Sequence, residues 1–244
     1  MRLFEPIVLG VVQGVTEFLP ISSSAHLRIV GELLPSATDP GATFSAITQV
    51  GTEVAVLVYF RHDIARILRQ WTRALRGAIA DSDADARLGW QIILGTIPIG
   101  AAGYLGQAYI RSSFRSLNLT ATVLIIFGVA LGLADLLGRR TRELHQLRCS
   151  DGILYGLAQA SALIPGVSRS GATTTMGLAL GFTRTAAAEY AFLLAVPSVF
   201  ASGIYELWTS FRQPSSYGAK ETALATIVSA GVGFAVISLL MKYI

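Results

Sequence analysis

Charged residues are scarce in this chain of 244 residues: they make up 14% of it, while apolar residues make up 52%. Soluble domains average about 25% charged residues, so the shortage indicates an integral membrane protein. The single cysteine, Cys149, excludes an intramolecular disulfide and a cysteine-based metal cluster. The net charge of +4 does not indicate nucleic-acid binding, because the arginines lie between apolar runs, where they orient a membrane protein.

Long apolar runs dominate what is present. A membrane-spanning helix needs about 20 consecutive, mostly apolar residues. Five segments meet this requirement: 42–60, 90–110, 119–137, 187–208 and 222–243. We therefore predict a single membrane domain over 1–244 with an all-α polytopic fold.

Two further apolar segments, 3–34 and 152–182, are each interrupted by polar residues. Backbone groups in such a break cannot hydrogen-bond to lipid, so the break must pack in protein or line a water-filled cavity. A re-entrant helical hairpin satisfies this condition, and we predict one in each segment. The breaks LPISSSA (19–25) and IPGVSRSGA (164–172) are similar, which indicates an internal repeat, with repeat one over 1–138 and repeat two over 151–244.

Arginines give the orientation of these repeats. Six arginines lie in 61–87 and four in 139–148, which is typical of cytoplasmic loops. The loop between them, 111–117, then lies outside, so the two hairpins enter the membrane from opposite sides. The sequence therefore predicts inverted repeats whose polar breaks meet near the middle of the membrane.

The first break carries groups that can do chemistry. They are Gln13, Glu17, Ser22, Ser23, Ser24 and His26. Gln13 and Glu17 lie four residues apart, on one face of a helix. The serines follow Pro20, where a new helix would present its positive end to an anion. Two simpler interpretations stay open: the serines only cap that helix, or Glu17 and His26 form a buried pair.

The second break carries a cation among hydroxyls and glycines. Its residues are Gly166, Ser168, Arg169, Ser170 and Thr173. Arg169 has no acidic neighbour in the sequence, and its planar fork matches a phosphate group. Pairing between Arg169 and Glu17 is the alternative. A carboxylate, a histidine, hydroxyls and an arginine at membrane depth together favour phosphoryl transfer.

Two stretches, QGVTEFLPISSSAH (13–26) and PGVSRSGAT (165–173), resemble the paired signature motifs of the undecaprenyl-diphosphate phosphatase family, the bacitracin-resistance type. FSAITQVGTEVAVLVYF, LGTIPIG and AFLLAVPSV extend the resemblance over most of the chain. The resemblance implies a hydrolase of the bacterial inner (plasma) membrane that converts undecaprenyl diphosphate to the monophosphate used in cell-wall synthesis. It also implies inverted repeats with two re-entrant hairpins, and one more span than the five found here.

The resemblance also assigns roles to residues. The catalytic residues would be Glu17, Ser23, His26 and Arg169. The diphosphate would be bound by Ser22, Ser24, Gly166, Ser168, Arg169, Ser170 and Thr173. Glu17, with Gln13 as a weaker second ligand, would hold a divalent cation, Mg²⁺ or Ca²⁺. The nucleophile stays open among Ser23, His26 and water.

Several further expectations complete the hypothesis. The substrate is a prenyl diphosphate lipid that reaches the site from the outer face and lays its tail against 90–110; the protein contacts membrane lipid and forms a homodimer. Gln49 and Thr52 are expected to satisfy Glu53, which lies within an apolar span. The alternative function is a transporter or flippase of an anionic prenyl lipid or ion, because inverted repeats with broken helices are also transporter architecture.

Overall fold

The computed structural model describes residues 3–80, 82–106, 117–210 and 216–244, and the regular structure within these ranges is helical. Five of the described helices are long and apolar enough to cross a membrane, as the sequence predicts. They are α3 (Gly41–Tyr59), α5 (Ala84–Leu105), α7 (Leu117–Leu137), α10 (Arg184–Ser210) and α11 (Ala219–Tyr243).

The helix α5 begins earlier than predicted. The side chain of Asp83 caps the helix by accepting hydrogen bonds from the backbone N–H groups of Asp85 and Ala86, at 3.1 and 3.0 Å, so the helix starts at Ala84, six residues before the predicted start at 90. The predicted end of this span at 107–110, and the outer loop up to 116, lie outside the described residues.

The arginine-rich stretch after α3, which we predicted to be a loop, contains the helix α4 (Arg61–Leu75). Its apolar residues recur at helical spacing, and Ile67 and Ala74 on that face are buried. Arg66 and Arg69 lie on the exposed side. The density of arginine hid an amphipathic helix that packs against α3 and α5.

Four short helices form two pairs around the polar breaks. The first pair is α1 (Phe4–Thr16) and α2 (Ser23–Leu33); the second is α8 (Cys149–Ala160) and α9 (Arg169–Ala179). Each has 11 to 13 residues, fewer than the 20 or so that a span needs, and the members of each pair pack together. Short 3₁₀ turns, η1 (Leu144–Gln146) and η2 (Ser161–Leu163), precede and follow α8.

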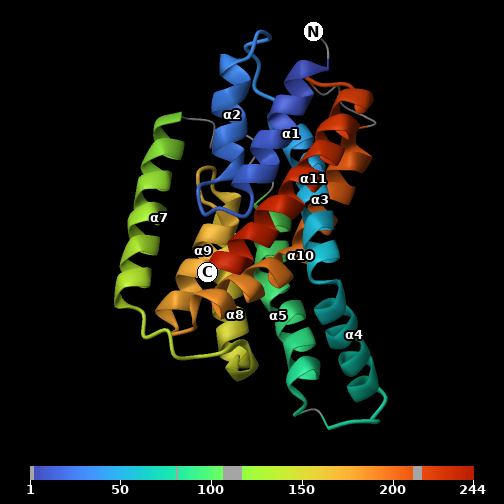
Figure 1. Ribbon diagram of the computed structural model, residues 1–244, viewed down its shortest axis with the longest axis vertical. Coiled ribbons are helices and arrows are strands. Elements are labelled where there is room, and N and C mark those ends of the chain that lie inside the picture. The colour runs from blue at the N-terminus through green and yellow to red at the C-terminus, as the bar shows by residue number, and fades with distance from the viewer. Residues whose placement is uncertain (1–2, 81, 107–116, 211–215) are drawn as a thin grey trace.

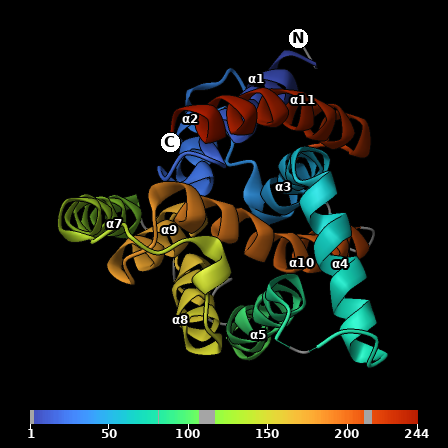
Figure 2. The same ribbon diagram turned by 60° about the horizontal axis from the view of Figure 1, so that its bottom comes forward.

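The helices form layers, with α3 and α10 in the middle (Figures 1 and 2). On one side α11 packs against α3 and α1, and on the other α5 packs against α10 and α8. The helix α7 lies at the edge, against α9, and most of its apolar side chains are exposed. The first pair is therefore supported by α11, and the second by α5 on the side of α8 and by α7 on the side of α9.

Glycine allows this packing at the closest approaches. A Cβ atom on Gly51 of α3 would lie 2.2 Å from the carbonyl oxygen of Thr226 on α11. A Cβ atom on Gly156 of α8 would lie 2.3 Å from the carbonyl oxygen of Gly95 on α5. Small residues that let helix backbones approach are the usual means of helix association in membranes.

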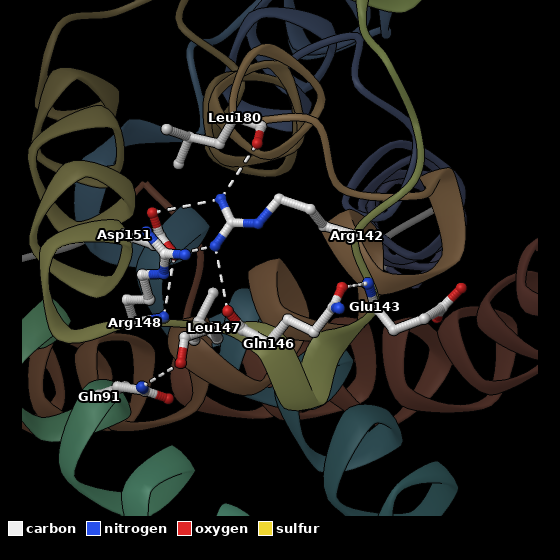
Figure 3. Close-up of polar contacts among 8 residues, drawn as sticks. All are labelled: Gln91, Arg142, Glu143, Gln146, Leu147, Arg148, Asp151 and Leu180. Atoms are coloured by element: carbon white, nitrogen blue, oxygen red, sulfur yellow. Dashed lines mark hydrogen bonds and ion pairs between the residues drawn. The ribbon is translucent and has the colours of Figure 1, made fainter.

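One arginine fastens the base of the second pair (Figure 3). The guanidinium of Arg142 donates to both carboxylate oxygens of Asp151 at the start of α8, with the shorter distance 2.5 Å. It also donates to the carbonyl groups of Leu180 and Gln146, at 3.1 and 3.0 Å, and lies 4.1 Å from the ring centre of Phe182. These contacts fix where α8 begins and where α9 ends.

We expect Arg142→Ala to lower the free energy of unfolding by about 3 kcal/mol, because it leaves the buried carboxylate of Asp151 without its partner. The matched control is Arg184→Ala, which removes a more exposed pair with Asp135 and should cost about 1 kcal/mol or less. Thermal unfolding in detergent measures both. Equal losses for the two variants would contradict a structural role specific to Arg142.

Candidate functional site

A carboxylate, Glu17, lies at the centre of the polar residues between the two helix pairs. It follows α1, and its side chain accepts three hydrogen bonds. The amide nitrogen of Gln13 and the hydroxyl of Ser23 donate to Oε2, each at 2.7 Å. The amide nitrogen of Gln49 on α3 donates to Oε1. A negative charge at this depth is thus stabilised by donors from three helices.

The amide of Gln49 also joins Glu17 to the second break. Its oxygen accepts a hydrogen bond of 3.2 Å from Nη2 of Arg169, the first residue of α9. Glu17 and Arg169 therefore face the same place, connected through Gln49 rather than as a direct ion pair. The hydroxyl of Ser170 donates to the backbone carbonyl of Glu17 at 3.0 Å, so the two breaks also touch through the backbone.

The other residues of the second break shape the start of α9. Ser168 accepts a hydrogen bond of 3.1 Å from the N–H of Gly171 and caps the helix. Its hydroxyl lies 3.2 Å from that of Ser170. Thr173 is fully buried and donates to the carbonyl of Arg169 at 2.7 Å. These contacts fix the position of the backbone from which the Arg169 side chain extends.

The first break places its histidine beside the serines. Nδ1 of His26 lies 2.9 Å from the carbonyl oxygen of Ser22, while all the hydrogen bonds of the Glu17 carboxylate go to other residues. Ser22 precedes α2 but its side chain does not cap that helix; its hydroxyl lies 3.3 Å from that of Ser24. Ser22 has a φ of 66°, a strained conformation for a residue other than glycine.

Gly166 requires glycine for two reasons, the tight turn of its backbone and the lack of space beside it. Its φ is +98°, and a Cβ atom there would lie 2.6 Å from the carbonyl oxygen of Thr120 on α7. The close approach of α7 to the second break thus explains this glycine.

The expectation for Glu53 is wrong. Glu53 is 2% exposed, and its Oε1 has no hydrogen-bond partner. Gln49 is engaged with Glu17 and Arg169, and the Thr52 hydroxyl donates to the backbone carbonyl of Gln49 at 2.8 Å. The sequence also did not lead us to predict Gln49 as a residue of the site. The available signal was that Gln49 and Glu53, two polar residues, lie four positions apart within an apolar span.

The residues offer limited ligation for a divalent cation. Among the described residues, no three His, Cys, Asp or Glu side chains gather as a metal-binding group. Gln13 turns its amide nitrogen, not its oxygen, toward Glu17. Glu17 is the carboxylate of the two breaks that would serve a cation, and Mg²⁺ is commonly held by one or two carboxylates together with the phosphates of a substrate. The site fits a cation of this shared kind.

An apolar groove of about 510 Å³ lies between α3, α4, α5 and α10. Trp71 of α4, Ile93 and Thr96 of α5, and Pro197 of α10 contribute to its lining. Leu57 of α3 also lines it, and this residue lies one helical turn beyond Glu53 on the same face of α3. Along α3 the groove therefore extends to within one helical turn of Glu53.

These features define a class: a polytopic helical membrane protein whose short helix pairs hold a carboxylate and an arginine at one site. The family model for the bacitracin resistance protein BacA matches residues 6–244, and the chain belongs to this family.

Relatives of known name are similar over the whole chain. The undecaprenyl-diphosphatase of Micrococcus luteus is 62% identical, with 100% of this chain and 89% of the relative covered. The undecaprenyl-diphosphatase of Clavibacter michiganensis is 57% identical, with the same coverage. The undecaprenyl-diphosphatase of Thermobifida fusca is 52% identical and is covered over 83% of its length by 100% of this chain.

We expect Gln49→Leu to lower the free energy of unfolding by about 1–3 kcal/mol, because the substitution leaves buried polar groups of Glu17 and Arg169 without a partner. The control is Gln70→Leu on α4, where the amide only accepts an exposed hydrogen bond from Arg73; it should change stability by about 0.5 kcal/mol or less. Thermal unfolding in detergent compares the two, and an unaffected Gln49→Leu protein would contradict the bridging role.

Proposed function

We propose that this protein hydrolyses undecaprenyl diphosphate to undecaprenyl phosphate and inorganic phosphate, and so recycles the carrier lipid for cell-wall synthesis. The names of its relatives support the substrate, since they are undecaprenyl-diphosphatases at 52–62% identity. The observation that carries the proposal is the contact of 2.7 Å between the Ser23 hydroxyl and the Glu17 carboxylate, beside an arginine connected to the same carboxylate.

The second break would hold the diphosphate. Nε and Nη1 of Arg169 are buried and have no hydrogen-bond partner, so the side chain has donors to offer to phosphate oxygens. The helix α9 begins at Arg169 and α2 at Ser23, so the positive ends of two helices start beside the site. Ser22, Ser24, Gly166, Ser168, Ser170 and Thr173 complete the proposed phosphate-binding residues.

Ser23 is the proposed nucleophile. Glu17 accepts the proton of the Ser23 hydroxyl as Oγ forms a bond to the terminal phosphorus. The bond from that phosphorus to the bridging oxygen breaks, and undecaprenyl phosphate leaves with the electron pair. Water then attacks the phosphorus of the phosphoserine, the bond to Oγ breaks, Oγ takes back the proton held by Glu17, and inorganic phosphate is released. His26 has a free ring nitrogen, Nε2, for acid or base chemistry; attack by His26 or directly by water are the competing routes.

A divalent cation, Mg²⁺ or Ca²⁺, bound by Glu17 and the substrate phosphates would supply charge neutralisation during this reaction. Gln13 would then orient Glu17 through the hydrogen bond that it already makes. Arg169 and Ser23 keep their roles as phosphate clamp and nucleophile.

We further propose that the two helix pairs are re-entrant hairpins in inverted repeats. Corresponding residues support this: Gln13 and Gln159 are both fully buried, and α2 and α9 both have 11 residues. Two serine hydroxyls at the start of each helix are also close together: those of Ser22 and Ser24 are 3.3 Å apart, and those of Ser168 and Ser170 are 3.2 Å apart. The packing of α11 on α1 also matches the packing of α5 on α8.

We propose that the protein lies in a bacterial inner membrane with the arginine-rich stretches 61–87 and 139–148 on the cytoplasmic side, and that its site is reached from the outer face. The exposed apolar side of α7 is a surface through which two copies could form the proposed homodimer.

We expect the purified protein to release inorganic phosphate from undecaprenyl diphosphate in detergent, and Ser23→Ala to lower kcat by at least about 100-fold because it removes the nucleophile. Ser238→Ala on α11, whose hydroxyl bonds only to the carbonyl of Phe234, is the control and should keep normal turnover. Phosphate release measures both variants, and rapid-quench trapping should find phosphate on Ser23.

If the trapped phosphate is on His26, the nucleophile is His26 and not Ser23. If no covalent phosphate is trapped, water attacks the substrate directly. No phosphate release, combined with movement of the lipid in vesicles, would instead support the carrier that the same architecture allows.

We expect the prenyl tail to occupy the groove between α3, α4, α5 and α10. Thr96→Phe fills part of this groove and should raise KM for undecaprenyl diphosphate about 10-fold while leaving KM for farnesyl diphosphate unchanged, because a short chain does not reach so far. Ile227→Phe on α11, a residue that is 70% exposed, is the control and should leave both KM values unchanged. Equal effects on both substrates would place the tail elsewhere.

A further inference from the structure

The arginines of α4 are of two kinds, paired and unpaired. The guanidinium of Arg66 lies 2.7 Å from the carboxylate of Asp63 and 2.9 Å from that of Asp85. Three further arginines share one face at the spacing i, i+4 and i+7, and all three are exposed: Arg69, Arg73 and Arg76. We call them the arginine face. Among the residues that the structure describes, they form no ion pair; Arg73 only donates to the amide oxygen of Gln70, at 3.2 Å.

The acidic residues that follow α4 in the described chain do not neutralise the arginine face. Asp83 caps α5 with its side chain, and Asp85 pairs with Arg66. The helix dipole favours a cation in the last turn, where Arg73 lies, but Arg69 lies a turn earlier, beyond the range of this effect. Like charges at this helical spacing repel one another. The positive charge of the face is therefore left for a partner outside the chain.

Two tryptophans indicate the depth of the arginine face. Trp71 of α4 packs edge-on against Trp90 of the spanning helix α5, with ring centres 5.5 Å apart, and Trp90 is 42% exposed. Tryptophan near the end of a span is typical of the headgroup region. Arg69 and Arg73 lie two residues from Trp71, about 3 Å along the helix axis. Arg76 lies about 8 Å from it along the axis. Because the headgroup layer is about 5–8 Å thick on each side of a bilayer, the arginine face lies at the level of lipid phosphates.

Exposed leucines border the arginine face. Leu68 and Leu75 are each 54% exposed, and each directly precedes an arginine of the face. Successive residues of a helix are rotated by about 100°, so the leucines form a strip beside the arginines. A lipid with an anionic headgroup complements both strips, since its phosphate suits the arginines and its acyl chains suit the leucines. A free anion would complement the arginines alone.

We propose that the arginine face binds the phosphodiester headgroups of anionic phospholipids, whose acyl chains lie against Leu68 and Leu75. The planar guanidinium of arginine binds phosphate oxygens in pairs. An anionic lipid is favoured over a zwitterionic one, because the amine of a zwitterionic headgroup already neutralises its phosphate. The bound lipids hold α4, and with it the connection from α3 to α5, at the membrane surface. This interaction uses neither Glu17 nor Arg169 and does not depend on the proposed hydrolysis.

Native mass spectrometry in detergent tests the proposal with dioleoyl phosphatidylglycerol as the probe. We expect the unchanged protein to retain this lipid. The triple variant Arg69→Gln/Arg73→Gln/Arg76→Gln should bind it at least about 10-fold more weakly, since each arginine near an anionic headgroup contributes about 5-fold. Dioleoyl phosphatidylcholine, which has the same acyl chains, should bind weakly to both proteins. Phosphatidylglycerol should also raise the melting temperature of the unchanged protein more than that of the variant.

The control variant loses the same net charge elsewhere: Lys220→Gln/Lys242→Gln/Arg184→Gln. Lys220 and Lys242 are exposed on α11, and Arg184 is paired with Asp135. This control should bind phosphatidylglycerol as the unchanged protein does. Equal weakening in the control and in the triple variant would mean that binding follows net charge alone, and it would overturn the proposal.

The side chains of the arginine face are exposed, so the triple variant should fold. If it does not, the double variant Arg69→Gln/Arg76→Gln leaves the hydrogen bond of Arg73 intact and should weaken phosphatidylglycerol binding at least about 5-fold. Equal binding of phosphatidylglycerol and phosphatidylcholine by the unchanged protein would contradict the preference for an anionic headgroup. Loss of an oligomer, rather than of lipid, from the triple variant would make the face a contact between two copies of the chain and would also refute the proposal.

Discussion

The hydrogen bonds of the Glu17 carboxylate connect the helices of the site, because a carboxylate packed between apolar helices must be satisfied by the protein itself. Its donors come from α1, from the first residue of α2 and from the middle of α3. Through Gln49 the same carboxylate reaches Arg169 at the start of α9. Four helices are thereby held in one relative position by groups that lipid cannot stabilise.

The remainder of the fold serves to bring those helices close. α3 and α10 lie between the two short pairs, while α11 and α5 support the outer sides of α1 and α8 (Figure 2). Backbones approach most closely at glycines such as Gly51 and Gly156, where any side chain would collide with a facing carbonyl group. The ion pair of Arg142 with Asp151 then fixes the base of the second pair. Precise packing at a distance from the site thus determines the positions of its charges.

Long apolar runs were enough to predict five membrane-spanning helices, because the length of a run and its lack of charge dictate a span whatever its neighbours are. The helix α4 was not predicted, because a stretch rich in arginine is typical of a cytoplasmic loop. Its packing against α5, which buries Ile67, shows that it is an amphipathic helix. The polar residues of the site were found because they are conspicuous in an apolar chain. Gln49 was predicted only as a partner of Glu53, because the residues around an amide in the sequence do not determine which distant side chain it will hydrogen-bond.

The sequence alone determined the class of the protein, the number of spans and the two polar breaks, since these follow from local composition and from the cost of polar groups in lipid. It also determined the family, because paired motifs over most of the chain are specific. Only the tertiary structure decided that Gln49 joins Glu17 to Arg169 and that Glu53 keeps an unpaired oxygen beside them. Those contacts depend on which face of α3 points toward the two helix pairs. The packing of α3 against α10 and α11 determines that orientation.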